Sequence, residues 1–318
     1  MRLWSLRRSR ASREPLDEDP RVPPGPSPAR PLLALTLFAL TCLSTLFAGA
    51  VHAGAVDLTR PPTWLLSGVP FAGTLLAILG VHELGHYVTA RRYHAAVSLP
   101  YFIPAPPPFP FGTLGAIIRM RSPVTDRNTL LDIAAAGPLA GLVLAIPALV
   151  IGLSWSTVGP APDGLYIDVG NSVVTGVVRT AIFGPLPPGT FVYTHAVADA
   201  GWVGLFVTAL NLFPVGQLDG GRIAYALFGR RHARIGRLVL GGTLAMGVVT
   251  WLWNLDTTWT AGINWFVWAA LLYFLIGVRH GAPLDDWTPL TPWRRRTGLL
   301  CLVLFVLLVP PHPLQQLG

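Results

Sequence analysis

Long apolar runs alternate along the chain with short stretches of charged residues, glycine and proline. Seven of these runs are nearly free of charge and are longer than buried strands, which predicts helices. We expect six or seven of them to cross a membrane, because about 20 apolar residues span a bilayer. The last run is short for a complete span. The runs cover residues 31–51, 63–90, 130–155, 196–214, 238–253, 260–278 and 297–309.

Two connections between the runs differ from simple loops. Residues 98–123 contain prolines that prevent a helix, and residues 112–121 have the β-branched, partly alternating pattern of a strand. Non-helical backbone near a membrane must be covered by protein or line a water-filled cavity. The pattern therefore predicts a short β hairpin beside the helices. Residues 156–195 are rich in glycine and proline, which predicts an external loop with little core of its own.

The composition agrees with an integral membrane protein. Only 12% of the residues are charged and 52% are hydrophobic, and the charged share is about half that of an ordinary soluble domain. Residues 1–30 are rich in arginine and proline, and we expect a disordered cytoplasmic tail there. The apolar run at 31–51 exceeds the ~7–15 residues of a signal-peptide core, so a retained membrane anchor is favoured.

The net charge of +8 comes from arginine alone, since the chain has no lysine. With a cytoplasmic N-terminus, every arginine except Arg60 and Arg179 falls in a cytoplasmic tail or loop. This asymmetry is the positive-inside pattern of membrane proteins. The basic charge therefore needs no nucleic-acid partner, and its partner is the lipid bilayer. The arginine bias and the absence of a transit-like leader favour a bacterial plasma (inner) membrane.

The second apolar run carries the sequence HELGH, in which His82 and His86 are four residues apart. On a helix they project from the same face, one turn apart, and two neutral imidazoles at that spacing can bind one zinc ion. Glu83 follows the first histidine and is suited to take a proton from a zinc-activated water. An unpaired glutamate inside a membrane span is costly, which favours a functional role over a chance match.

Two histidines leave a catalytic zinc ion short of a third protein ligand, and Asp219 is the best candidate. It follows Asn211 and Pro214 in NLFPVGQLDG, where the proline interrupts an otherwise apolar run and exposes polar groups. Asn211 could donate a hydrogen bond to the substrate carbonyl. A simple helix cap at Asp219 is the structural alternative.

HELGH on one span, followed two spans later by N-x-x-P-x-x-x-x-D-G, resembles the site-2 protease family of intramembrane zinc metalloproteases. The proline-rich segment looks like the subgroup without a PDZ domain, which comprises the chloroplast ethylene-dependent gravitropism-deficient proteins and their bacterial relatives. By this resemblance His82, His86 and Asp219 bind one zinc ion per chain, and Glu83 and Asn211 are catalytic. Residues 130–152 look like the family's middle core helix.

The resemblance implies a zinc metalloendopeptidase that hydrolyses a peptide bond in or near a transmembrane segment of a membrane protein substrate. Its expected fold is all-α and polytopic, with about six to seven transmembrane helices, a three-helix catalytic core and a membrane-associated hairpin. Residues 31–318 would form the protease domain, with the core at about 62–229. The alternative is a non-catalytic metal-binding scaffold or transporter, since transporters also bind ions at broken helices.

Overall fold

The computed structural model describes residues 30–57, 59, 62–107, 109–162, 166–253, 262–277, 283–311 and 314–317. The predicted disordered tail at 1–30 lies outside this part, apart from Arg30. The α-helices are α1 (Pro31–His52), α2 (Val69–Arg92), α3 (Arg127–Ser154), α4 (Val173–Phe183), α5 (Ala196–Asn211), α6 (Asp219–Phe228), α7 (His232–Trp253), α8 (Ile263–Leu271) and α9 (Pro292–Leu308). Short helical turns occupy Pro62–Gly68, Gly229–Arg231 and Leu272–Ile276.

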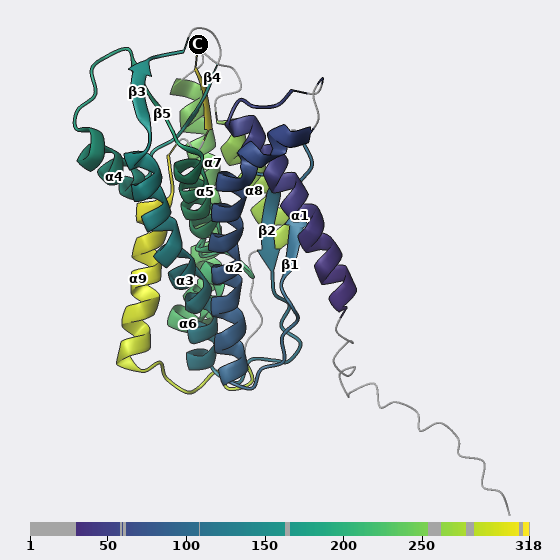
Figure 1. Cartoon of the computed structure of the whole chain (residues 1–318). Helices are drawn as coiled ribbons and strands as arrows, with labels where there is room; N and C mark the ends of the chain where they lie inside the picture. The colour runs from purple at the N-terminus through teal and green to yellow at the C-terminus, as the bar shows by residue number, and fades with distance from the viewer. Residues whose placement is uncertain are drawn as a thin grey trace, which may run out of the picture.

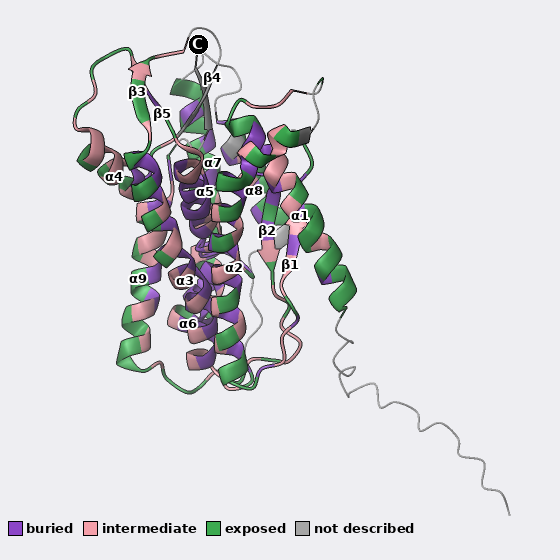
Figure 2. Ribbon diagram, viewed as in Figure 1, coloured by how far each residue is buried: buried purple, intermediate pink, exposed green. Residues whose placement is uncertain are grey.

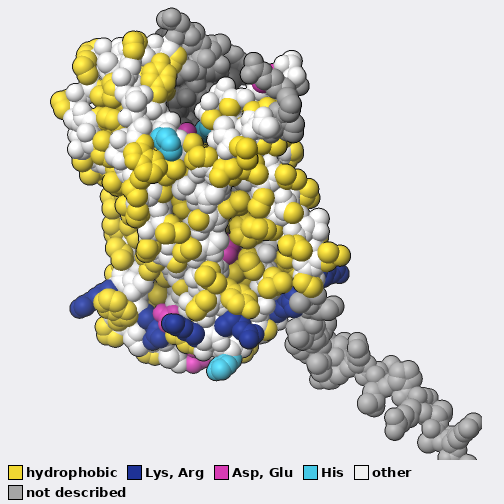
Figure 3. Space-filling view, viewed as in Figure 1, with side chains coloured by type: hydrophobic (Ala, Val, Ile, Leu, Met, Phe, Trp, Pro, Cys, Tyr) yellow, Lys and Arg dark blue, Asp and Glu magenta, His cyan; other side chains and the backbone are white. Residues whose placement is uncertain are grey.

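The polytopic helical class is confirmed. Within the described residues, four helical segments are long and apolar enough to cross a membrane, and the shorter α4, α5 and α8 are also apolar. The predicted runs correspond to α1, α2, α3, α5, α7, α8 and α9. Arginine side chains gather at one end of the molecule, and apolar side chains cover its middle (Figure 3). The four long segments are Pro31–His52, Thr63–Arg92, Arg127–Ser154 and Asp219–Trp253.

Helices α2, α3 and α5 pack together at the centre of the molecule (Figure 1). Small residues allow this close approach: a Cβ atom on Gly85 of α2 would lie 2.5 Å from the carbonyl oxygen of Ala136 in α3. A Cβ atom on Gly204 of α5 would lie 2.8 Å from Ile78 of α2. Close packing of this kind holds membrane helices together where water supplies no hydrophobic drive. Burial is accordingly concentrated in α5 and the faces around it (Figure 2).

The predicted hairpin is present. Strand β1 (Tyr101–Pro104) pairs antiparallel with β2 (Thr113–Ile117), and Phe102 lies opposite Ala116. The hairpin stands between α1 and α2, with β2 on the side of α2 (Figure 1). A strand is thereby brought beside the helix that carries HELGH.

Residues 156–195 contain more structure than the predicted external loop. Strand β3 (Thr157–Pro160) pairs with β5 (Thr190–Tyr193), and α4 lies between them in the sequence. Ser172 and Thr175 form a capping box that begins α4, which stabilises a helix too short to be evident from apolar periodicity. A further strand pair joins β4 (Tyr166–Val169) to β6 (Leu314–Leu317).

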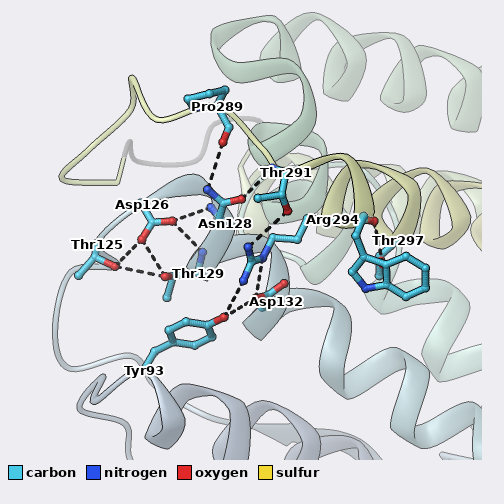
Figure 4. Close-up of polar contacts among 11 residues, drawn as sticks. Tyr93, Thr125, Asp126, Asn128, Thr129, Asp132, Pro289, Thr291, Arg294 and Thr297 are labelled. Atoms are coloured by element: carbon cyan, nitrogen blue, oxygen red, sulfur yellow. Dashed lines mark hydrogen bonds and ion pairs between the residues drawn. The ribbon is translucent and has the colours of Figure 1, made fainter.

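At the arginine-rich end, polar contacts join α2, α3 and α9 (Figure 4). Arg294 Nε of α9 lies 2.8 Å from Asp132 Oδ2 of α3, and Arg294 Nη2 donates to the hydroxyl of Tyr93 at 3.1 Å. The Tyr93 hydroxyl in turn donates to Asp132, and this bond raises the pKa of Tyr93. Asn128 accepts from the backbone N–H of Thr291 at 3.1 Å. These contacts fix the start of α3 relative to the end of α2 and the start of α9.

Candidate metal centre

His82 and His86 lie on the face of α2 that is turned into the protein. Their Nε2 atoms are 3.2 Å apart, as expected for two histidines one helical turn apart. Both histidine side chains are buried, and so is that of Glu83, which lies between them in the sequence. The exposed fractions are 3% for His82, 5% for Glu83 and 8% for His86.

Asp219 reaches the histidine pair from a break between two helices. Helix α5 ends at Asn211 and α6 begins at Asp219, with Pro214 in the intervening turn. The turn is tight: Gly216 has a φ of +55°, and a Cβ atom on Gly220 would lie 1.9 Å from the carbonyl oxygen of Leu212. Asp219 Oδ2 lies 3.1 Å from Nε2 of His86 and 3.5 Å from Nε2 of His82. The predicted interruption of the apolar run therefore delivers a carboxylate to the two imidazoles.

The hydrogen bonding of His86 shows that these three groups suit a metal ion. Its Nδ1 lies 2.7 Å from the carbonyl oxygen of Ile133, so Nδ1 carries the proton and a neutral ring has an acceptor at Nε2. That acceptor faces the carboxylate of Asp219 and the ring of His82. Acceptors this close repel one another unless a proton or a cation lies between them. Their ligand atoms all lie within 4.8 Å of one another, close enough to hold one metal ion.

Helix α3 leaves room for the imidazoles because it presents glycine to them. A Cβ atom on Gly137 would lie 2.1 Å from Nε2 of His86, and one on Gly141 would lie 3.3 Å from Cβ of His82. The first distance is far inside van der Waals contact, so a larger residue at position 137 would require the His86 ring to move. The two glycines therefore leave room for the imidazoles and allow close helix packing.

Asn211 and Glu83 adjoin the three metal-suited residues. Nδ2 of Asn211 lies 3.4 Å from Nε2 of His82. Asn211 and Glu83 both line a cavity of about 120 Å³. Strand β2 and the residues after it also border this cavity. Arg222, one turn into α6, lies 3.9 Å from Asp219 Oδ1. All five residues named from the sequence thus lie around one small buried space.

Two participants in this site were not predicted. The carbonyl of Ile133 orients His86, but a backbone group has no residue type by which to recognise it. Arg222 follows Asp219 by three residues, a spacing that places both on one side of a helix. That spacing was the available signal for Arg222.

The sequence profile of peptidase family M50 matches residues 70–252. The probable zinc metalloprotease EGY2 of Arabidopsis thaliana chloroplasts is 32% identical over 297 residues, which cover 88% of this chain and 49% of that protein. The chloroplast protein EGY1 of the same plant, also named a probable zinc metalloprotease, is 33% identical over 279 residues, or 82% and 46% of the two chains. The chain spans about half the length of these curated relatives. No solved structure matches it.

Proposed function

Because the chain belongs to peptidase family M50, we propose that it is a zinc metalloprotease that cleaves membrane proteins in or near a transmembrane segment. The observation that carries this proposal is the buried convergence of His82, His86 and Asp219 beside Glu83. A cluster of ionisable groups at membrane depth is costly unless the groups bind something or one another. Two imidazoles and a carboxylate match the donor set of catalytic zinc sites.

The three ligand residues would hold one zinc ion. When bound, zinc supplies Lewis-acid polarisation of a carbonyl group and lowers the pKa of water to about 7. Ile133 keeps His86 in the tautomer that binds metal, and such an outer partner raises metal affinity. The glycines of α3 leave room for the imidazoles at these positions.

Glu83 would act as the general base. Its carboxylate would accept a proton from the attacking water as the new C–O bond forms, and would then pass a proton to the leaving amine as the peptide C–N bond breaks. Asn211 Nδ2 lies beside the ligand pair and would donate a hydrogen bond to the carbonyl oxygen as negative charge develops there. No other residue is required to balance the protons of the hydrolysis.

Strand β2 would present the substrate. An α-helical substrate keeps its carbonyls in internal hydrogen bonds, so the cleaved segment must be extended. Ala116, Ile117 and Ile118 border the cavity that contains Glu83. We infer that an unwound substrate segment pairs with this strand by β-augmentation.

The orientation of the site follows from the arginines. Helix α2 runs toward the arginine-rich end, and HELGH lies within its last three turns. We propose a multi-pass protein with a cytoplasmic N-terminus and with the metal site nearer the cytoplasmic face. Residues 31–318 would form one protease domain with its core at about 62–229. Location in a bacterial plasma membrane stays a sequence-based prediction, and the chloroplast relatives give it no support.

A metal and cleavage assay on Glu83→Gln tests the proposal. The purified wild type and variant are analysed for bound zinc by mass spectrometry and for cleavage of a model transmembrane peptide in lipid vesicles. We expect about one zinc ion per chain in both, and turnover lower by ~10²–10⁴-fold in the variant. Asp57→Asn, beyond the end of α1, serves as a matched loss of one carboxylate and should cleave normally.

Each contrary result has a specific meaning. Equal cleavage by wild type and Glu83→Gln would remove Glu83 as the base. Absence of bound zinc from the wild type would contradict the metal site. Zinc binding by both with no cleavage by either would favour the non-catalytic scaffold.

A further inference from the structure

A second and larger cavity lies at the end of the molecule opposite the arginine-rich end. It has a volume of about 650 Å³, compared with about 120 Å³ beside the metal cluster, and falls within the ~300–1,000 Å³ of small-molecule sites. The end of α1, the turn between β1 and β2, the end of α3, α4, β5 and the start of α5 enclose it. Asp199 at this cavity and Asn211 at the metal cluster are both on α5, so the two lie about 18 Å apart along that helix.

The interior of the cavity is apolar. Phe111, Leu149, Leu153 and Trp202 line it, and each of these side chains is buried within the fold. Trp202 stacks on Phe206 with ring centroids 5.3 Å apart, which gives this wall a fixed aromatic surface. A wall of this kind favours an aliphatic or aromatic ligand and offers little to a polar one.

A smaller set of polar and charged side chains completes the lining. Asp199 accepts a hydrogen bond from the hydroxyl of Thr194, and its Oδ2 lies 3.5 Å from Nδ1 of His52. The other ring nitrogen of His52 lies 3.0 Å from the carbonyl oxygen of Pro110. Because both ring nitrogens face oxygen acceptors, a protonated imidazole satisfies the arrangement. Figure 3 shows histidine and acidic side chains within a hollow at this end.

Arg179 is the cationic side chain of the lining that stands apart from the His52–Asp199 pair. It is half-buried, lines the cavity from α4, and has no carboxylate within ion-pair distance among the described residues. With Asp199 compensated by His52, its guanidinium gives the cavity a net positive charge. Guanidinium groups bind carboxylates and phosphates through paired hydrogen bonds.

The cavity also lies at the level of the membrane boundary. Helix α1 ends at His52, α3 ends at Ser154 and α5 begins at Ala196, and residues near all three points contribute to the lining. An amphiphile at this level has its chain at the depth of the bilayer and its head group in the polar zone.

We propose that this cavity binds an anionic amphiphile, with its acyl chain between Leu153 and Trp202 and its anionic group on Arg179. The ligand class is a long-chain carboxylate or phosphate ester. Free fatty acid and membrane phospholipid share this chemistry. The binding site is separate from the proposed peptidase centre and does not depend on its activity.

Binding of tritiated palmitate to the purified full chain in a neutral maltoside detergent tests the proposal. We expect saturable binding at one site. Arg179→Gln should weaken it about tenfold, the equivalent of one charged hydrogen bond. Leu153→Trp should also weaken it, because the indole would occupy the proposed position of the acyl chain. The matched controls are Arg237→Gln, which removes an exposed arginine at the other end, and Val177→Trp, which adds an indole to the outer face of α4; both should bind normally.

Competing ligands show whether the ligand is a free fatty acid or a membrane lipid, and they also provide results that would contradict the proposal. Hexadecanol should compete weakly and equally in wild type and Arg179→Gln, since it lacks the anionic group. Phosphatidylglycerol competing as well as palmitate identifies a membrane lipid, and palmitate alone identifies a free fatty acid. Palmitate binding unchanged in Arg179→Gln would overturn the proposal. So would binding of a short peptide with a free C-terminal carboxylate in the absence of saturable palmitate binding.

Normal folding of Leu153→Trp is checked by its thermal unfolding and its zinc content. Val192→Phe, which narrows the same cavity from β5, is a second variant with the same expected loss. Normal palmitate binding by both variants would place the ligand elsewhere.

Discussion

The two ends of α5 contrast in how space and polarity are arranged. At Asn211 the helix borders a cavity of about 120 Å³ crowded with ionisable groups, and at Asp199 it borders one of about 650 Å³ with apolar walls. The smaller cavity is the one whose ionisable side chains suit metal binding and proton transfer. Buried charges are tolerated only where they contact partners, and the helices must approach closely to bring those partners together. The larger cavity is therefore not the one that carries the proposed catalytic residues.

The residues on α3 account for the difference. Toward the arginine-rich end this helix presents Gly137 and Gly141 to the histidines, and toward the other end it presents Leu149 and Leu153 to the open cavity. Glycine brings two backbones together and leaves only enough room for ligand side chains. Where the helices end and α4 covers them, larger side chains surround an unfilled space.

Gly137→Ala is the most direct test of the crowded end, by which we mean the region around the small cavity where α2, α3 and α5 pack against the histidines. The added methyl group would lie 2.1 Å from Nε2 of His86, so the imidazole must leave its position. We expect metal affinity to fall about 100-fold or more, measured by competition with a zinc chelator. Gly80→Ala on α2, where a Cβ atom would meet nothing within 4 Å, should bind zinc normally. Because alanine favours helix formation over glycine, a weakened helix cannot explain a loss at position 137.

Proline at position 116 should impair pairing of the substrate with β2 and leave metal binding at the same end unchanged. Ala116→Pro removes a backbone N–H from β2 beside the cavity. We expect turnover of an extended transmembrane peptide to fall at least about tenfold, the effect of a lost hydrogen bond of ~1.4 kcal/mol, with zinc content unchanged. Ala116→Val keeps the N–H and should retain turnover. Unchanged turnover in the proline variant would exclude pairing of the substrate with this strand.

Asp126→Ala tests how far the crowded end depends on the first turn of α3. Asp126 accepts hydrogen bonds from the N–H groups of Asn128 and Thr129 at 2.8 Å and 3.0 Å. Loss of such a cap costs about 1 kcal/mol, which thermal unfolding should detect. Palmitate binding at the far cavity should not change, and a parallel loss there would show that the two ends are one cooperative unit.

The same cap predicts a dependence on pH. Burial opposes ionisation of Asp126, but the hydrogen bonds from Thr129, Thr125 and Asn128 outweigh it and lower its pKa. A lowered pKa stabilises the fold above the unfolded value of about 3.9, and this contribution is lost as the pH falls below it. The difference in unfolding free energy between wild type and Asp126→Ala should therefore shrink in acid. A difference that stays constant down to pH 3 would contradict the role of the ionised cap.

Leu153→Trp should have the smallest effect on the metal centre. The outer cavity has room for an indole, so we expect zinc content and peptide turnover to match the wild type within about twofold. A whole indole at position 153 should therefore disturb zinc binding less than a single methyl group does at position 137. Loss of zinc from Leu153→Trp would show that packing at one end controls the other.

The sequence was sufficient for the helical class, the hairpin and the residues at the metal cluster. HELGH and the interrupted run around Asp219 are recognisable because ionisable groups and proline stand out in apolar helices. The proximity of these two segments in the fold could be expected from ligand chemistry, since a zinc ion bound by two imidazoles needs a third protein donor. Their roles in metal binding and catalysis stay predictions until the variants are measured.

The remaining features depend on packing between distant segments. Helix α4 and the β3–β5 pair are short, and their glycines and prolines hide the periodicity that reveals longer elements. The carbonyl of Ile133 and the pairing of His52 with Asp199 arise only once separate helices are adjacent. No local pattern of residue types encodes such contacts.

The distance in sequence between His86 and Asp219 has a consequence for biosynthesis. The two residues are 133 positions apart, so at ~5–20 residues per second the ribosome completes Asp219 roughly 7–27 s after His86. During that interval the histidine pair has been synthesised without its carboxylate. The donor set is complete only after α5 and the turn before α6 have inserted beside α2. Insertion of the later helices thus sets the earliest moment at which these three groups could hold one metal ion.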